Sequence, residues 1–509
     1  MSTRRDSAPG ERAPAPLLWL LFAIVVLAVS NGRWIVPAAA WLGPAFMLHF
    51  LDTSRRWSGL ALGLTASFFV WSFSWQGMIP APGWLYFMVT ASYAVVYFLP
   101  YIAHRFLASG SAAFRSSLVF PTAWVGVDLL FQRYVSPYGS WTSVAYTQLD
   151  FLALTQLASI TGSFGVTFLV TWFASTLAWL WRSGPTVRRL RTAALSYGIP
   201  FAAVMALGTS RLAIVEFASE TLRVAAITPT EKLETEFAAA FQAALTAGTL
   251  SDTQTTELID AATRLNSDLV DRTRQAADED VDLIAWSETA ARVTQSGEAD
   301  LIEGGRQLVD AYGVVLVLAY ATWDPESTPP LGNKLAILHP GATSAVHYRK
   351  ARPVIGAEAP FLAGRDSAVA IIETPDGRLA AAICHDLDFP DLIREAGRKN
   401  VRLMVGPSAD WPQIEDMHAG MAKLRAVENG FALMRPTSGG RTIAVDAHGR
   451  EMTWVDQDGV RITDVSAAGV PTVYVRIGDL FAWLCLGGFL LLAVGRLADQ
   501  RRLLTPRPQ

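Results

Sequence analysis

Cysteine is scarce in this chain of 509 residues, which holds two cysteines, Cys384 and Cys485. Cys485 lies in an apolar run and Cys384 ends a strand-like run, so we expect no disulfide between them. The sequence also has no zinc-spaced Cys/His cluster, no Gly-rich phosphate loop and no internal repeat. Its net charge of -3 gives no sign of a nucleic-acid partner. We therefore expect no metal, no cofactor and no nucleic acid.

Charge is also sparse, because charged residues make up 17% of the chain and hydrophobic residues 51%. The mean hydropathy of +0.28 is too high for an ordinary soluble protein. The apolar residues are unevenly spread. Residues 1–215 contain long apolar runs, whereas the following stretch resembles a soluble protein. The sequence thus predicts a membrane part followed by a water-facing domain.

The apolar runs predict eight membrane spans, since a bilayer core takes about 20 apolar residues per helix. Seven precede the polar domain and one follows it. The spans are about 17–30, 34–51, 57–78, 83–107, 117–131, 159–181, 192–214 and 477–495. The first could instead be a signal peptide, although the apolar runs continue well past any cleavage point. The domain limits that we expect are a tail 1–16, a transmembrane domain 17–215, a polar domain 220–476, a helix 477–496 and a tail 497–509.

The arginines indicate the orientation of these spans. With a cytoplasmic N-terminus, the external loops hold only Arg33 and Arg133, with Arg211 near a helix end, and the other arginines outside the polar domain fall in cytoplasmic segments. This is a strong positive-inside bias. It predicts an extracytoplasmic polar domain and a cytoplasmic C-terminal tail. The external loop 134–150 is long and aromatic, and it is either a plain connector or a wall of the active site.

The polar domain alternates short β-rich runs with longer helical stretches, as expected of a layered α/β domain. The expected strands are LRVAAITP, VDLIAWSE, VVLVLAY, LAILH, SAVHY, AVAIIET, RLAAAIC, RLMVG, FALMR and TIAVDA. The expected helices are 251–277, 299–312, 389–398 and 416–428. Asp376-Gly377 and His448-Gly449 are expected to form turns between strands.

Three segments place a reactive side chain just past an apolar strand: LIAWSETA with Glu288, VHYRKARP with Lys350, and LAAAICHD with Cys384. Taken singly, Glu288 fits a solvated strand end or a cap for the next helix, Lys350 a surface residue, and Cys384 a buried small hydrophobe. Taken together they suit acyl transfer. A thiolate is the nucleophile, a carboxylate takes its proton, and an ammonium stabilises thiolate and oxyanion. The N–H of His385 is a candidate backbone donor.

The order and context of Glu288, Lys350 and Cys384 resemble the nitrilase, or carbon–nitrogen hydrolase, superfamily. RKARPVIGAEAP is similar to the family segment in which a catalytic Lys is followed eight residues later by a Glu, here Glu358. With seven spans before the domain and one after it, the chain resembles the apolipoprotein N-acyltransferases. The resemblance implies a multi-pass helical membrane domain with an extracytoplasmic αββα sandwich. It also implies Cys384 as nucleophile, Glu288 as base and Lys350 as oxyanion stabiliser, with Glu358 and His385 in support.

The resemblance further implies a two-step reaction in the bacterial inner membrane. A phospholipid donates an acyl chain to the Cys, giving a thioester, and the free amine of a diacylglyceryl-cysteine on an apolipoprotein accepts it. The partners would be the donor lipid, the apolipoprotein and the bilayer. Two alternatives stay open: a membrane-anchored amidase that hydrolyses a small C–N substrate, and a scaffold that binds lipid or lipoprotein without catalysis.

Two segments depart from the family pattern. The chain has Cys384-His385-Asp386 where the family usually shows Cys-Tyr-Glu, and 227–230 reads Ile-Thr-Pro-Thr where a Gln-Gly-Asn segment is common. Both changes put the choice of donor or acceptor in doubt. His385 is either a titratable neighbour of the thiolate or a packed or exposed residue, and the second interpretation is favoured.

Overall fold

The computed structural model describes residues 16–109, 111–214, 221–247, 252–323, 331–358, 366–455 and 459–504. These residues form two compact units. The first unit takes its described residues from Met1–Asp128, Thr167–Phe201 and Trp483–Gln509, and the second from Leu129–Val166 and Ala202–Ala482. Parts of the predicted tails (1–15 and 505–509) and the predicted junction 215–220 lie outside the described residues.

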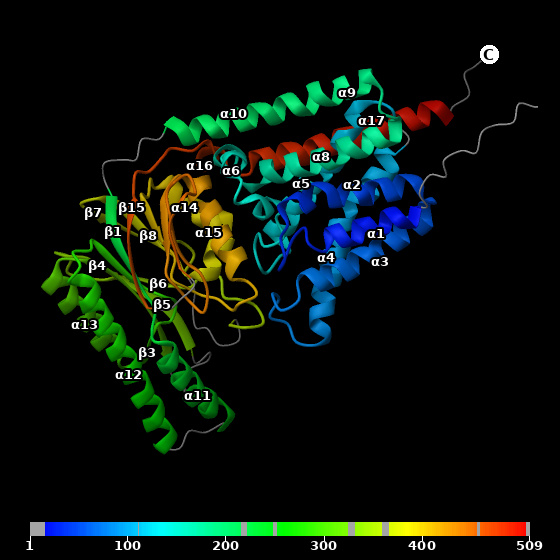
Figure 1. The fold of residues 1–509 in the computed structure, drawn as a ribbon. Coiled ribbons are helices and arrows are strands. Elements are labelled where there is room, and N and C mark those ends of the chain that lie inside the picture. Colours follow the sequence, from blue (N-terminus) through cyan, green and yellow to red (C-terminus); the bar gives the residue numbers. More distant parts are fainter. Residues whose placement is uncertain are drawn as a thin grey trace, which may run out of the picture. The chain divides into compact units, whose positions relative to one another are not determined.

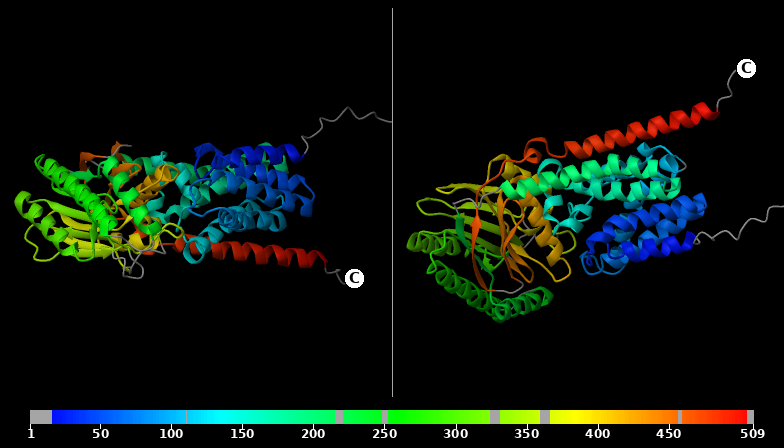
Figure 2. Two further views of the ribbon diagram at one scale, coloured as in Figure 1. Left: turned by 90° about the horizontal axis from the view of Figure 1, so that it is seen from below. Right: turned by 45° about the horizontal axis from the view of Figure 1, so that its top comes forward.

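The membrane-type part of the chain is helical, and each of the eight predicted spans contains a helix. The helices are α1 (Pro16–Leu27), α2 (Pro37–Thr53), α3 (Arg56–Ser74), α4 (Trp84–Ala103), α5 (Val119–Tyr134), α8 (Ser163–Ser183), α9 (Val187–Ala193), α10 (Ile199–Ile214) and α17 (Leu480–Leu504). Short η1 (His104–Ala108), η2 (Phe114–Leu118) and η4 (Ala194–Gly198) connect some of them. Helices α1 to α4 run side by side (Figure 2).

Length and composition allow some of these helices to cross a membrane. Within the described part of the chain, four are long and apolar enough: Trp84–Ala108, Ser163–Ser183, Val187–Ala213 and Leu480–Asp499. Helices such as α1, with 12 residues, are shorter than the roughly 20 residues that a bilayer core takes. The full count of eight spans therefore stays a prediction.

A buried ion cluster lies inside the first unit. Asp52 of α2 accepts a hydrogen bond from Arg182 Nη1 of α8 at 2.7 Å and lies 3.2 Å from His104 Nε2 of η1. Asp52 and His104 are nearly inaccessible to solvent. An ionisable side chain among apolar helices is costly unless it is paired. The contacts of Asp52 with Arg182 and His104 therefore explain how the first unit tolerates these ionisable side chains.

The second unit is built on two sheets. The first sheet has the order β15-β1-β2-β4-β5-β6, with β3 paired to β4. Its strands are β1 (Thr221–Ile227), β2 (Leu283–Trp286), β3 (Ala291–Thr294), β4 (Val315–Trp323), β5 (Leu331–Leu338), β6 (Val346–Arg349) and β15 (Val460–Ser466).

The second sheet has the order β14-β13-β11-β9-β8-β7, and two-residue strands β10 (Ser408–Ala409) and β12 (Thr437–Ser438) pair beside it. Its strands are β7 (Ala370–Thr374), β8 (Gly377–Ala381), β9 (Leu403–Val405), β11 (Ala432–Arg435), β13 (Thr442–Val445) and β14 (Glu451–Val455). The neighbours β7 and β8 form a hairpin, and Gly377, at φ +109°, is the residue at which the chain leaves the turn and enters β8. That left-handed angle suits glycine and agrees with the predicted Asp-Gly turn.

Side-chain alternation shows how the layers stack. On β1, Val224 and Ala226 join the core shared by the two sheets, whereas Ala225 and Ile227 join a second core under helices. A sheet covered on both faces has few exposed positions, which explains the apolar runs seen in the sequence. Helices α12 (Asp252–Ala277) and α13 (Glu298–Tyr312) cover one sheet, and α14 (Pro390–Arg398) and α15 (Glu415–Asn429) cover the other (Figure 1). The order of layers is α-β-β-α.

Smaller elements complete the second unit. They are η3 (Val144–Gln148), α6 (Leu152–Thr155), α7 (Ala158–Thr161), α11 (Glu231–Ala247), η5 (Cys384–Asp388) and α16 (Val473–Ile477). All ten predicted strands and the four predicted helices correspond to observed elements, except that residue 251 lies outside the described residues. The elements that the sequence analysis did not predict include α11 and the strands β3, β10, β12, β14 and β15, of which β14 and β15 are edge strands.

Candidate active site

Cys384 lies in a tight turn that follows β8 of the second sheet. β8 ends at Ala381, so the prediction that Cys384 ends this strand is wrong, and the residue instead begins η5. Its φ of +45° is uncommon for a residue with a side chain and costs backbone strain. The N–H of Cys384 donates to the Pro407 carbonyl at 2.8 Å, which holds this conformation. The thiol is 4% exposed.

Glu288 follows β2 and is buried, so its interpretation as a solvated strand end is wrong. Its Oε1 accepts hydrogen bonds from Asn333 Nδ2 at 2.7 Å and from Lys350 Nζ at 2.6 Å. Its Oε2 accepts from the Ala409 N–H at 3.0 Å. Both oxygens of the Glu288 carboxylate are therefore held in place by hydrogen-bond donors.

Lys350 follows β6 and is 2% exposed, so the expectation of a surface lysine is wrong. Its Nζ lies 2.6 Å from both Glu288 Oε1 and Glu358 Oε2. Burial acts to lower the pKa of Lys350, but the two carboxylates outweigh it and raise that pKa well above its usual value. The Val354 N–H orients Glu358 at 2.9 Å. We call Glu288, Asn333, Lys350 and Glu358 the triad cluster.

The backbone of Ala409 connects the triad cluster to the thiol. Its N–H binds Glu288, and its carbonyl lies 3.7 Å from Cys384 Sγ. Burial and the Glu288 charge raise the pKa of the Cys384 thiol well above its usual value, and Lys350 acts in the opposite direction. Burial also raises the pKa of Glu288, against the effect of Lys350. The resting arrangement is thus a neutral thiol beside a strengthened base.

Asp386 joins the Lys350 segment to the Cys384 turn. Its Oδ2 accepts from the Tyr348 hydroxyl at 2.8 Å and from the Ile383 N–H at 3.0 Å, and its Oδ1 accepts from the Arg352 N–H at 2.7 Å. Burial raises the pKa of Asp386 to about 6. Asp386 therefore keeps the Lys350 segment and the Cys384 turn in register.

His385 is fully buried, as the favoured interpretation of a packed residue expects. Its Nδ1 lies 2.9 Å from the Arg352 carbonyl, and its ring contacts the rings of Tyr138, Trp141 and Phe389. Burial and the nearby Lys350 lower the pKa of His385 to about 3. The imidazole is therefore neutral at ordinary pH and does not titrate with the thiol.

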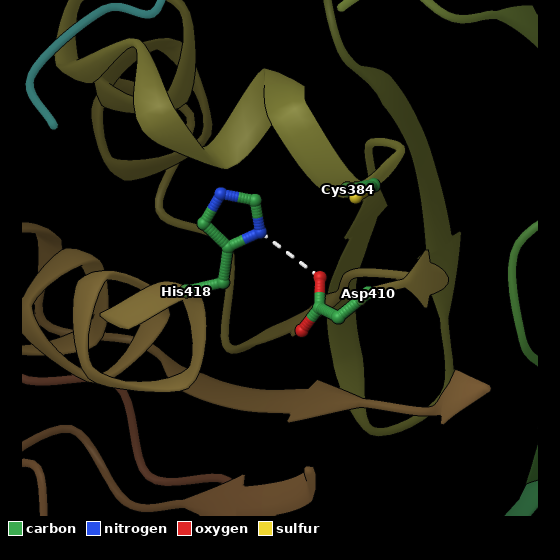
Figure 3. Close-up of side chains that lie close together, drawn as sticks. All are labelled: Cys384, Asp410 and His418. Atoms are coloured by element: carbon green, nitrogen blue, oxygen red, sulfur yellow. Dashed lines mark hydrogen bonds and ion pairs between the residues drawn. The ribbon is translucent and has the colours of Figure 1, made fainter. Parts of the chain in front are cut away.

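A second group of polar side chains reaches the thiol, and sequence reasoning missed it. His418 of α15 places Nδ1 2.9 Å from Asp410 Oδ1, beside Cys384 (Figure 3). Ligand-type atoms of Cys384, Asp410 and His418 all lie within 4.8 Å of one another. Arg435 of β11 binds both oxygens of Asp410, at 2.8 and 2.9 Å. The Asp410 carboxylate is thus already neutralised by a cation, which favours an ion-pair network over a metal site.

Asp388 completes this group, which we call the histidine cluster: Asp388, Asp410, His418 and Arg435. Asp388 Oδ2 lies 3.4 Å from His418 Nε2 and accepts from Trp141 Nε1 at 2.8 Å. The Ser140 N–H and hydroxyl both donate to the Asp388 carbonyl, at 3.0 and 2.8 Å. The loop 134–150 is therefore fastened to the residues that follow Cys384. This favours its interpretation as a wall of the active site over a plain connector.

The same loop is anchored a second time, at α15. Tyr146 Oη accepts from Arg425 Nη2 at 2.7 Å, and Arg425 pairs with Glu428 at 2.9 Å. The Ser163 N–H donates to the other oxygen of Glu428, also at 2.9 Å. All of these groups are buried. The loop is thus an integral part of the second unit.

Comparisons with known proteins agree with this architecture. The carbon–nitrogen hydrolase family matches residues 224–472, and the N-terminal domain of apolipoprotein N-acyltransferase matches residues 23–176. An apolipoprotein N-acyltransferase of Geobacter metallireducens is 26% identical over 94% of this chain and 90% of its own length. Another, of Rhodopseudomonas palustris, is 25% identical over 94% of this chain and 91% of its own. A solved amidase from Nesterenkonia sp. has a TM-score of 0.36 and 16% identity, covering 50% of this chain and 92% of that one.

In this chain the N-terminal match covers a helical part, and the second match covers the two-sheet domain that follows it. Residues 224–472 include the α-β-β-α layers and the whole of the triad and histidine clusters. Because both matches lie in one chain whose relatives align over nearly its full length, the chain belongs to the apolipoprotein N-acyltransferase family of carbon–nitrogen hydrolases.

Proposed function

We propose that this protein transfers a fatty acyl chain from a phospholipid, through a thioester on Cys384, to the N-terminal amine of a diacylglyceryl-cysteine lipoprotein. The observation that carries the proposal is the buried meeting of a thiol, a carboxylate and an ammonium. Glu288 and Lys350 lie 2.6 Å apart, and both act on the pKa of Cys384. The family match to a membrane N-terminal domain supports a donor and an acceptor that are both held in a bilayer.

In the first step, Cys384 Sγ attacks the ester carbonyl of the phospholipid while Glu288 takes the thiol proton. The raised pKa of Glu288 suits it to this role, because a stronger base accepts the proton more readily. Lys350 and the N–H of His385 stabilise the oxyanion of the tetrahedral intermediate. When this intermediate collapses, the C–O bond breaks and Glu288 returns the proton to the leaving lysophospholipid oxygen.

In the second step, the lipoprotein amine attacks the thioester carbonyl and Glu288 takes a proton from the amine. Collapse breaks the C–S bond, forms the amide and regenerates the thiol with that proton. Glu358 keeps Lys350 in place during both steps through its 2.6 Å contact. No cofactor enters the balance of either step.

The proposed location is the bacterial inner membrane, with the polar domain 220–476 on the periplasmic side. Residues 17–215 and 477–496 would form the membrane domain with eight spans, and 1–16 and 497–509 the cytoplasmic tails. The described helices that are apolar and long enough to cross a bilayer support a membrane protein. The positive-inside pattern supports the orientation.

The test uses the purified full-length protein and a phospholipid with a fluorescent acyl chain. We expect a hydroxylamine-sensitive label on the wild-type protein that is absent from Cys384→Ala and is discharged by a diacylated lipopeptide. A Cys384→Ala variant that still takes the label would overturn the proposed nucleophile. Release of free fatty acid without transfer, or turnover of a small amide, would instead favour a hydrolase.

A further inference from the structure

A cavity of about 240 Å³ lies in the second unit, next to the segment that carries the nucleophile. Its walls come from the end of α5, the start of the loop 134–150, and residues 389–391 after η5. Arg352 and Phe389 line it together, and the Arg352 guanidinium lies 5.1 Å from the centre of the Phe389 ring. The cavity has a mixed polar and apolar wall, as ligand sites commonly have.

The wall of this cavity contains charged side chains of both signs. Arg133 faces Asp479 at 3.5 Å, so these two partly neutralise each other. The remaining cation is Arg352 and the remaining anion is Asp391, and neither forms an ion pair with any residue that the structure describes. The cavity thus offers one free positive and one free negative group.

The wall of the cavity also contains a hydrogen-bond donor without a partner among the described residues. Gln132 lines the cavity, and its Nε2 is buried without a partner among the described residues. A buried donor that stays unsatisfied is costly and points to a ligand or an ordered water. An oxygen-rich group beside Gln132 and Arg352 would satisfy both donors.

The position of Arg352 is tied to the catalytic groups. It lies two residues after Lys350, its N–H donates to Asp386 at 2.7 Å, and its carbonyl lies 2.9 Å from His385 Nδ1. Both partners follow Cys384 within two residues. These contacts hold the Arg352 backbone in register with the turn that carries the thiol.

We infer that this cavity binds the phosphodiester head group of the acyl donor, with Arg352 and Gln132 on the phosphate oxygens and Asp391 facing a cationic substituent. The inference rests on the proposed function. Guanidinium groups match phosphate geometry, and a zwitterionic head group matches a wall with one free charge of each sign. In this arrangement the ester carbonyl of the same lipid is the group that Cys384 would attack.

The test measures binding separately from catalysis. The probe is a fluorescent phosphoethanolamine lipid whose chains are ether-linked, so that no acyl group can be transferred, and the background is full-length Cys384→Ala protein. Arg352→Gln should weaken binding by about 10-fold, as expected for a lost charge-assisted hydrogen bond. Arg352→Lys should weaken it less, because the charge remains. The matched control is Arg349→Gln, an exposed arginine on β6 that does not line the cavity.

Competitors separate the possible sources of the phosphate group. A dialkylglycerol without phosphate should compete poorly, and Asp391→Asn should reduce the preference for ethanolamine over glycerol head groups. Equal displacement by inorganic phosphate and by intact phospholipid would overturn the head-group assignment. So would equal affinity in Arg352→Gln and Arg349→Gln. Thioester labelling of the wild-type enzyme is measured alongside, so that an intact label with unchanged binding refutes the cavity alone, and a missing label refutes the proposed function.

Discussion

Two polar clusters reach Cys384, and they differ in what they do to a carboxylate. In the triad cluster, burial raises the pKa of Glu288. In the histidine cluster, burial also acts to raise the pKa of Asp410, but Arg435 and His418 outweigh it and hold that pKa well below its usual range. The pKa values of these two carboxyl groups near one thiol are thus shifted in opposite directions. Such a difference distinguishes a general base from a structural acid. We therefore propose that Glu288 transfers the proton and that Asp410 belongs to the scaffold.

The largest expected effect comes from removing the one cation of the triad cluster. Lys350→Met leaves Glu288 and Glu358 buried without their counter-ion, so we expect stability to fall by about 3–5 kcal/mol. Thioester formation should fall by about 1000-fold, since an oxyanion donor is lost too. Labelling rates with a fluorescent phospholipid and thermal unfolding measure both.

The control for this variant is Lys334→Met. Lys334 lies on β5, outside both clusters, and forms a 2.8 Å ion pair with Glu298 of α13. The Lys334→Met variant should lose stability while keeping the wild-type labelling rate. If Lys334→Met slowed labelling as much as Lys350→Met, the effect of Lys350 would be structural, and the triad cluster would lose its catalytic assignment.

The second prediction sets Glu288→Gln against Asp410→Asn. Both carboxylates raise the pKa of Cys384, so both variants should lower the pH at which iodoacetamide alkylates this thiol. Only Glu288→Gln removes the base, and it should slow thioester formation by about 100-fold or more. Asp410→Asn should retain at least a tenth of the wild-type rate among folded molecules. A comparable loss of rate in both variants would contradict the division between the clusters.

Three residues of the triad cluster, together with Cys384, could be predicted from sequence, whereas Asn333, which lies inside β5, could not. Cys384, Lys350 and Glu288 stand directly after apolar runs, and Glu358 follows Lys350 at the family's spacing. Their burial could not be predicted, because it depends on distant donors such as Asn333 and Ala409. Local patterns identify the side chains, whereas their pKa values depend on tertiary contacts.

The histidine cluster could not be predicted at all. Trp141 binds Asp388 across 247 positions of sequence, and His418 comes from the first turn of a helix, where a lone histidine is unremarkable. Most strands followed from their apolar runs. The edge strand β15 did not, because its alternation breaks after Ile462. Contacts between segments far apart in sequence leave no periodic signal for a single chain to reveal.

The third prediction concerns His385, which lies between the clusters. Because burial lowers its pKa to about 3 from an ordinary value near 6.5, the unfolded chain binds a proton between these pH values that the folded protein does not. Stability contributed by the neutral His385 is therefore complete above pH 6.5 and is lost as the pH falls toward 3. His385→Gln should reduce the slope of unfolding free energy against pH by about 1.4 kcal/mol per unit in this window. An unchanged slope in urea titrations from pH 7 to pH 5 would contradict the burial of a neutral imidazole.

The smallest effect is expected where the histidine cluster meets the loop 134–150. Trp141→Phe removes the 2.8 Å hydrogen bond to Asp388 but keeps most of the aromatic packing, so stability should fall by about 1–2 kcal/mol. The matched control is Trp323→Phe, because the Nε1 of that buried tryptophan has no partner among the residues described in the structure. If the histidine cluster is a scaffold, Trp141→Phe should loosen the loop to limited proteolysis and leave the alkylation pH of Cys384 unchanged. A shift of that pH in Trp141→Phe, with none in Trp323→Phe, would mean that Asp388 and His418 act on the thiol electrostatically, and the contrast between the two clusters would then be one of degree.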